Sequence, residues 1–229
     1  MKTTGIILSV LLYGAYIIFL GRIAWRFFIL ARARETDNRP ARAGKRMPVL
    51  LHTAADLFFL SKLFRSNRWL WLGEWLFHAA FVFVIIRHLR FIMDPVPGWL
   101  ISCQTFGIFS GYLLAGALVF IFAYKLITER KRYISGYNFL ILSLLLFISL
   151  TGLLMRNYFQ TDAVAAKEFM LRALAFSPAP APEGVIFMVH YIAALIFLIL
   201  LPAHIFSAPY TLMEARKREE ALRLVMHEK

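Results

Sequence analysis

Cysteine is almost absent from this sequence of 229 residues, in which Cys103 stands alone. A single cysteine permits no internal disulfide, and it excludes a metal site built from several cysteines. Acidic residues are also few, with 13 Asp and Glu against 26 Lys and Arg, so the formal net charge is +13. The basic residues collect between long apolar runs. That pattern is typical of membrane topology and argues against a nucleic-acid-binding surface.

Apolar residues are what the sequence has in excess. Hydrophobic residues make up 60% of the chain and aromatic residues 16%, which is more than a soluble domain can bury, so much of this surface must face lipid. A helix needs ~20 residues to cross a hydrocarbon core of ~30 Å. Five apolar stretches reach that length: roughly residues 4–30, 69–92, 104–127, 137–158 and 185–209. The sequence therefore predicts an all-α integral membrane protein with five transmembrane helices.

The distribution of Lys and Arg predicts the orientation of these helices. Positive charge collects in the segment 31–68, in the connection 125–132 and in the tail 211–229. The connections 93–103 and 159–184 are poor in Lys and Arg. The positive-inside rule then puts the N-terminus outside and the C-terminus inside.

We expect one membrane domain, residues 1–210, which includes the cytoplasmic loop 31–68 and is followed by a basic cytoplasmic tail at 211–229. Residues 49–66 have apolar positions at helical spacing and are expected to lie along the inner membrane surface. The first apolar stretch is longer than a signal-peptide h-region and has bulky residues at its end, so we expect it to remain as a helix. The Ser-Pro-Ala-Pro-Ala-Pro run at 177–182 predicts extended chain up to the fifth helix.

Four histidines lie within the apolar stretches, two on the second and two on the fifth: His78, His88, His190 and His204. An unsatisfied imidazole is costly in hydrocarbon, so histidines at membrane depth are functional candidates by default. Imidazole is also an axial ligand of haem iron. Because the two helices run in opposite directions, depth pairs His88 with His190 near the outer face and His78 with His204 near the inner face.

The spacing within each helix keeps both of its histidines on a common face. His78 and His88 are 10 residues apart and His190 and His204 are 14 apart, which gives ~15 Å and ~21 Å along the helices and angular offsets of ~80° and ~40°. Pro202 is expected to bend the fifth helix, which would reconcile the unequal heights. The pattern predicts two haem b groups between helices 2 and 5. They would be bound non-covalently, because no C-x-x-C-H motif is present.

Three arginines near the outer ends of the second and fourth helices run against the positive-inside rule: Arg87, Arg90 and Arg156. They either extend toward the interface or pair with haem propionates, and the sequence favours neither. Asp94 and Gln104 add polar groups at the mouth of the second and third helices.

Two roles besides haem binding could place histidines at membrane depth. Single histidines often form helix-to-helix hydrogen bonds, and a proton relay in a transporter would also place histidines in a membrane. Against a transporter, the first, third and fourth apolar stretches hold no acidic residue. His52 and His227 lie outside the apolar stretches, and solvated roles are expected for both. Three glycines of the third helix would permit the close approach of a backbone or a flat macrocycle, although simple helix packing accounts for them equally well: Gly107, Gly111 and Gly116.

Together, these features resemble a known family, the dihaem cytochrome b subunit (gamma subunit) of respiratory nitrate reductase. The helix 2 spacing His78-AAFVFVIIR-His88 matches that family, and the resemblance covers residues 4–210. The 14-residue spacing of His190 and His204 is shorter than in nitrate reductase itself. It is closer to the related subunits of the high-molecular-weight cytochrome, sulfite-reduction-associated and heterodisulfide reductase complexes.

The resemblance implies that His78 and His204 bind the iron of an inner haem, and that His88 and His190 bind the iron of an outer haem. It implies electron transfer across a prokaryotic cytoplasmic (inner) membrane during anaerobic respiration, between menaquinone or another quinone and a cytoplasmic iron–sulfur subunit. The implied quinone is expected to bind near the outer haem, where the polar groups are Arg87, Arg90, Asp94 and Gln104. Other membrane subunits and a periplasmic multihaem cytochrome c are further implied partners. The chain would be an electron-transfer subunit and not a stand-alone enzyme. The alternatives are another four-helix haem protein, such as a cytochrome b561 or formate dehydrogenase type subunit, or a haem-free membrane scaffold or transporter subunit.

Overall fold

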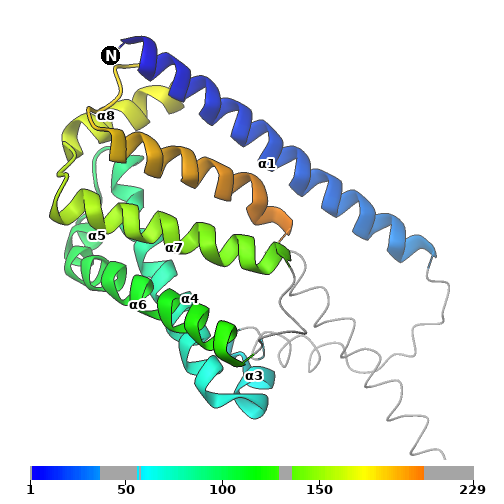
Figure 1. Cartoon of the computed structure of the whole chain (residues 1–229). Coiled ribbons are helices and arrows are strands. Elements are labelled where there is room, and N and C mark those ends of the chain that lie inside the picture. The colour runs from blue at the N-terminus through cyan, green and yellow to red at the C-terminus, as the bar shows by residue number, and fades with distance from the viewer. Residues whose placement is uncertain (1, 37–55, 57, 129–135, 204–229) are drawn as a thin grey trace, which may run out of the picture. The chain divides into compact units, whose positions relative to one another are not determined.

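The computed structural model describes residues 2–36, 56, 58–128 and 136–203. Within these residues the secondary structure is helical, without strands. The labelled elements are α1 (Lys2–Thr36), α3 (Ser61–Ser66), α4 (Arg68–His88), η1 (Leu89–Phe91), α5 (Gly98–Ser102), α6 (Gln104–Thr128), α7 (Gly136–Asn157) and α8 (Ala163–Leu174). A last helix covers Val185–Ala203 and is called the 185–203 helix below (Figure 1).

Five helices are long and apolar enough to cross a membrane: Thr3–Ile29, Arg68–Phe91, Gln104–Thr128, Gly136–Asn157 and Val185–Ala203. The predicted ranges agree with them to within one residue at every end that lies in the described residues. Many of their large apolar side chains are exposed, among them Ile17 at 71% and Phe106 at 66%. Such exposure is what lipid-facing helices require. The all-helical fold and its five candidate spans are as predicted, whereas the orientation in the membrane stays a prediction.

The chain divides into two compact units, one formed by Met1–Tyr16 with Leu72–Leu198 and the other by Ile17–Trp71 with Ile199–Lys229. In the first unit, α6 packs against α7. Leu118 and Ile121 of α6 are almost completely buried, at 0% and 1% exposure, so this helix carries a large part of the core.

Two glycines bring α4 and α6 close together at two levels. A Cβ atom on Gly73 of α4 would lie 2.7 Å from the Phe120 ring of α6. A Cβ atom on Gly107 of α6 would lie 2.7 Å from the side chain of Arg87 of α4. The antiparallel helices therefore touch near both ends of α4. Of the three glycines considered in the sequence, only Gly107 has this role, because a Cβ on Gly111 or Gly116 would meet nothing within 4 Å.

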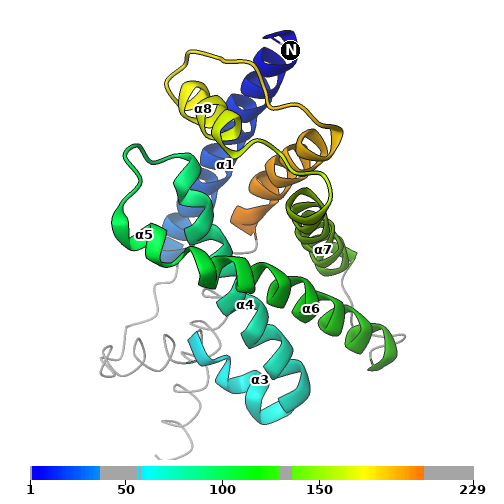
Figure 2. The same cartoon turned by 90° about the vertical axis from the view of Figure 1, so that its left-hand side faces the viewer.

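The connection 159–184, expected to be a loop, contains the helix α8. Asp162 caps its N-terminus, since its carboxylate accepts hydrogen bonds from the backbone N–H groups of Val164 (2.8 Å) and Ala165 (3.3 Å). Tyr13 of α1 donates a hydrogen bond to the Ala173 carbonyl at 2.7 Å. Accordingly, both views show α8 beside the N-terminal part of α1 (Figures 1 and 2). The run 177–182 is non-helical, as predicted.

The second unit is described more sparsely. Arg22 of α1 donates a hydrogen bond to the Ile199 carbonyl at 2.8 Å, and the Trp71 indole donates one to the Phe59 carbonyl at 2.7 Å. The helix α3 falls inside the segment 49–66 that was expected to follow the membrane surface. The predicted tail 211–229 and its boundary at 210 lie outside the described residues.

Candidate functional site

The structure brings His88 of α4 and His190 of the 185–203 helix together, as the depth argument predicted. Their ring centroids are 6.5 Å apart and their planes differ by 14°. These two residues are 102 positions apart in the sequence, so the fold alone joins them. Their role as metal ligands stays a prediction, but their separation can be tested against the geometry of an iron centre.

Both rings are held by hydrogen bonds from Nδ1. In His88, Nδ1 lies 2.7 Å from the Val84 carbonyl oxygen, and in His190, Nδ1 lies 3.1 Å from the Ile148 carbonyl oxygen. A carbonyl oxygen can only accept, so Nδ1 carries the proton in each ring and donates it. The lone pair then sits on Nε2, which is the form in which a histidine binds a metal while its other nitrogen is fixed by a hydrogen bond.

The helix α7 orients His190 with two further contacts. Thr151 Oγ1 is 3.0 Å from His190 Nδ1 and also 3.0 Å from the carbonyl oxygens of Phe147 and Ile148, either of which can accept its O–H. A Cβ on Gly152 would lie 3.3 Å from His190 Cε1, so the absence of a side chain there lets the ring approach α7. Sequence reasoning did not identify Thr151. Its only signal was a side-chain hydroxyl within an apolar stretch that also contains Ser143 and Ser149.

The ring separation fits a bis-histidine haem. Two imidazoles that bind one metal from opposite sides, each through a nitrogen ~2 Å from it, have ring centres about 6 to 6.5 Å apart. The observed 6.5 Å between His88 and His190 matches that value. Among the described residues, no group of three or more His, Cys, Asp or Glu side chains could hold a metal ion.

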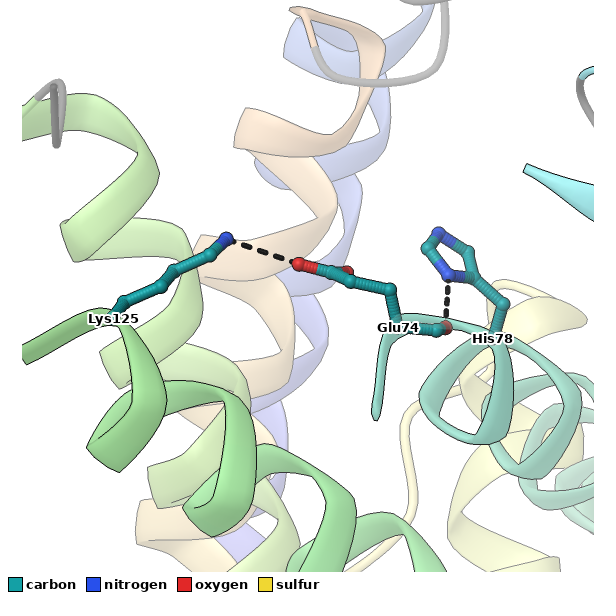
Figure 3. Close-up of polar contacts among 3 residues, drawn as sticks. All are labelled: Glu74, His78 and Lys125. Atoms are coloured by element: carbon teal, nitrogen blue, oxygen red, sulfur yellow. Dashed lines mark hydrogen bonds and ion pairs between the residues drawn. The ribbon is translucent and has the colours of Figure 1, made fainter. Parts of the chain in front are cut away.

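His78 of α4 has the same ring arrangement as His88. Its Nδ1 donates a hydrogen bond to the Glu74 carbonyl oxygen at 2.6 Å, so its lone pair also sits on Nε2 (Figure 3). The Phe77 ring meets it edge-on, at 4.7 Å between ring centroids. The predicted partner, His204, lies outside the described residues, as do His52 and His227.

The three arginines gather in the first unit. The positive charge of Arg87 is close enough to be repelled by those of Arg90 and Arg156. The Arg87 Nε is buried and has no hydrogen-bond partner in the described part of the chain. No ion pair to an acidic residue is found for any of the three within those residues. These three guanidinium groups, which have no acidic partner among the described residues, lie near the His88–His190 pair. Their positive charge is suited to binding an anionic or electron-rich ligand.

A cavity of about 440 Å³ lies against this cluster. Its polar lining comes from Arg87, Arg90, Gln104 and Lys167, and the remaining lining is apolar: Phe91, Val96, Leu100, Ile101, Ala163 and Val164. Arg156 does not line it. Asp94 instead pairs with Lys167 of α8 at 2.7 Å. The polar residues expected between the outer ends of the second and third apolar helices thus lie close together. Lys167, which sequence reasoning missed, lies beside them because α8 packs next to η1.

An ion pair joins α4 and α6 beside His78. Lys125 Nζ lies 3.0 Å from Glu74 Oε1, and the two side chains are only 24% and 19% exposed. Glu74 is the single acidic residue in the five apolar helices. Lys125 was interpreted only as a topology-determining charge, so sequence reasoning missed this pair.

Comparison with curated proteins identifies two relatives. The chain is 32% identical over 162 residues to the Hdr-like menaquinol oxidoreductase cytochrome b-like subunit of Archaeoglobus fulgidus, and 30% identical over 154 residues to the protein of the same name from Archaeoglobus profundus. The alignments cover 63% and 60% of this chain, but only 49% and 46% of the relatives. The chain therefore spans about half the length of the curated relatives it matches.

The sequence analysis predicted a resemblance to cytochrome b subunits. The relatives, both named as Hdr-like cytochrome b-like subunits, confirm that resemblance. No protein-family model matches the chain. No solved structure matches it either.

Proposed function

We propose that this chain, a relative of those cytochrome b-like subunits, is the membrane subunit of a menaquinol-linked oxidoreductase complex and holds two bis-histidine b haems. The single observation that carries the proposal is the His88–His190 pair, whose ring centroids are 6.5 Å apart and whose Nδ1 atoms are both bound to backbone carbonyls. Histidines that merely join two helices would be expected to bond to each other. Here each ring instead leaves Nε2 for a ligand.

His88 and His190 would hold the outer haem, and His78 and His204 the inner one. Bound haem supplies reversible one-electron transfer at the iron. The chain's own residues fix the ligand geometry: the carbonyls of Val84, Glu74 and Ile148 keep Nδ1 protonated and aim Nε2. With one haem beside the middle of α4 and one at its C-terminal end, electrons would be carried through the bilayer within this chain.

The arginines give the outer end its positive charge. Arg156, which does not line the cavity, is best suited to a haem propionate, since guanidinium binds carboxylates strongly. Arg87 and Arg90 line the cavity together with Gln104. A menaquinol would enter that cavity, whose volume of about 440 Å³ is in the range of small-molecule sites. Gln104 and the two arginines would orient its oxygen atoms, and the apolar lining would hold its rings.

Electrons would leave at the opposite end. The basic segments 31–68 and 211–229 are expected on the cytoplasmic side. There they would dock an iron–sulfur partner subunit, and they would also attract anionic lipid headgroups. The electron acceptor would thus lie across the membrane from the quinol.

The test is a reduced-minus-oxidised visible spectrum of the purified chain, with haem extracted and counted per polypeptide. Two low-spin b haems per chain are expected. Matched variants of the four membrane histidines should each remove one haem, whereas His227→Ala should remove none. A folded chain without haem would refute the proposal and favour the haem-free scaffold or proton-relay alternative.

The cavity needs its own measurement, which is the rate at which a menaquinol analogue reduces the haems. Substitution of Arg87, Arg90 or Gln104 should slow this reaction while the haem content stays at two. Unchanged rates in all three variants would remove the cavity from the proposal and leave the haem assignments intact.

A further inference from the structure

The ion pair between Glu74 and Lys125 lies one helical turn from a predicted haem ligand. Glu74 precedes His78 by four residues, a rise of ~6 Å along α4. Its side chain turns toward Lys125 of α6, and its backbone carbonyl accepts the His78 ring proton (Figure 3). One residue therefore contacts both the ligand and a cation from another helix.

The surrounding packing brings the two charges within reach. Gly73 lets α4 approach Phe120 and Ile121, and the Cβ it lacks would be 2.7 Å and 3.0 Å from their side chains. Lys125 follows one turn later on α6. Because the pair is mostly shielded from solvent, at 19% and 24% side-chain exposure, its charges are weakly screened.

We infer that Glu74 and Lys125 are a matched pair of charges that holds the reduction potential of the haem bound by His78 between the values that either charge alone would impose; this inference rests on the proposed function. Reduction adds one negative charge at the iron. A nearby carboxylate disfavours that step and a nearby ammonium favours it. Paired, the two largely offset each other, so the haem is insulated from either charge alone.

A purely structural ion pair predicts something different. Removing either partner would then weaken the contact between α4 and α6 in the same way, because each loss leaves one buried charge without its counterion. The potential hypothesis instead requires opposite shifts from the two single variants. The sign of the shift, and not its size, separates the two roles.

The experiment is a redox titration of the haem absorbance in Glu74→Gln, Lys125→Gln and the double variant. Glu74→Gln should raise the midpoint potential of one haem and Lys125→Gln should lower it, each by about a tenfold change in the reduction equilibrium, or ~59 mV for one electron. The double variant should return near the unaltered value. Glu74→Gln keeps the backbone carbonyl that holds His78, so the ligand itself is not disturbed.

Glu168→Gln is the matched control, because it changes a carboxylate to an amide in an exposed pair with Arg172 of α8. It should leave both midpoint potentials unchanged. Repeating the titration in a His88→Ala background, which should retain only the haem at His78, assigns the shift to that haem. Equal potentials in all variants, or shifts of the same sign in both single variants, would overturn this inference alone. An unaltered chain without haem would overturn the proposed function and this inference with it.

Discussion

His78 in the middle of α4 and His88 at its C-terminal end have the same ligand arrangement in opposite electrostatic surroundings. His78 and His88 both donate Nδ1–H to the carbonyl four residues earlier, at 2.6 and 2.7 Å. Next to His78, the charges of Glu74 and Lys125 balance. Near His88, three arginines repel one another, and none of them has an acidic partner in the described residues.

This difference suggests different roles for the two histidine positions. Arginines without acidic partners can bind an anionic or electron-rich ligand, so the His88 position is suited to ligand exchange. The charges of Glu74 and Lys125 already neutralise each other, so the His78 position is suited to electron transfer without a bound ion. Four predictions test this contrast, beginning with the variant expected to have the greatest effect.

The largest effect is expected from removing a ligand at one end. His88→Ala should reduce the haem content from two per chain to one, because a five-coordinate site loses much of its affinity, and the remaining haem should keep its spectrum. Haem extraction and visible spectra measure this. If both haems disappeared while the chain stayed folded, the two haem sites would not be independent.

A smaller effect is expected from removing a cation at the same end. Arg87→Gln should slow reduction by a menaquinol analogue by roughly 10- to 100-fold, the range expected for a lost charged hydrogen bond. Stopped-flow absorbance at the haem band measures the rate. Arg172→Gln, in an exposed pair, is the control. An unchanged rate would mean that Arg87 only extends toward the membrane surface.

The position of Arg87 can be tested without changing its charge. Gly107→Ala would put a methyl group 2.7 Å from the Arg87 side chain, so the free energy of unfolding should fall by about 1–2 kcal/mol. Gly111→Ala on the same helix meets nothing within 4 Å and should be close to neutral. Thermal unfolding in detergent compares the two variants. Equal stabilities would show that Arg87 can move aside easily.

The smallest effect is expected from Thr151→Val. It removes one of the two contacts at His190 Nδ1 and keeps the Ile148 carbonyl. Because loss of a residue that orients a ligand typically weakens binding ~10–100-fold and one acceptor remains, less than a tenfold loss in haem affinity is expected. Haem titration of the apoprotein measures it. No change at all would mean that the Ile148 carbonyl suffices.

The sequence predicted the elements whose signals are local. Twenty-residue apolar runs indicated the five spans, and histidine depth indicated the pairing of His88 with His190. It did not predict α8, although Asp162 before a helix-forming run is an N-cap signal, because the connection was interpreted from its proline-rich end. Thr151 was out of reach for another reason: which side of α7 faces the 185–203 helix depends on helix rotation, and an apolar span does not encode it strongly.

The Glu74–Lys125 ion pair could not be predicted by counting charges along the sequence. Lys125 fits the positive-inside rule, so its place in the sequence already had a physical reason. Only the antiparallel packing of α4 and α6 shows that it lies opposite Glu74. A lone acidic residue in an apolar run, four residues before a histidine, was nevertheless visible in the sequence as an uncompensated energetic cost.

The two glycine contacts between α4 and α6 have a consequence for the membrane itself. The contacts at Gly73 and Gly107 oppose sliding of one helix along the other. A bilayer that becomes thinner or thicker must then be accommodated by tilting both helices as one body. His78 and His88 would keep their spacing under such hydrophobic mismatch, and the protein could work in lipids of different chain length.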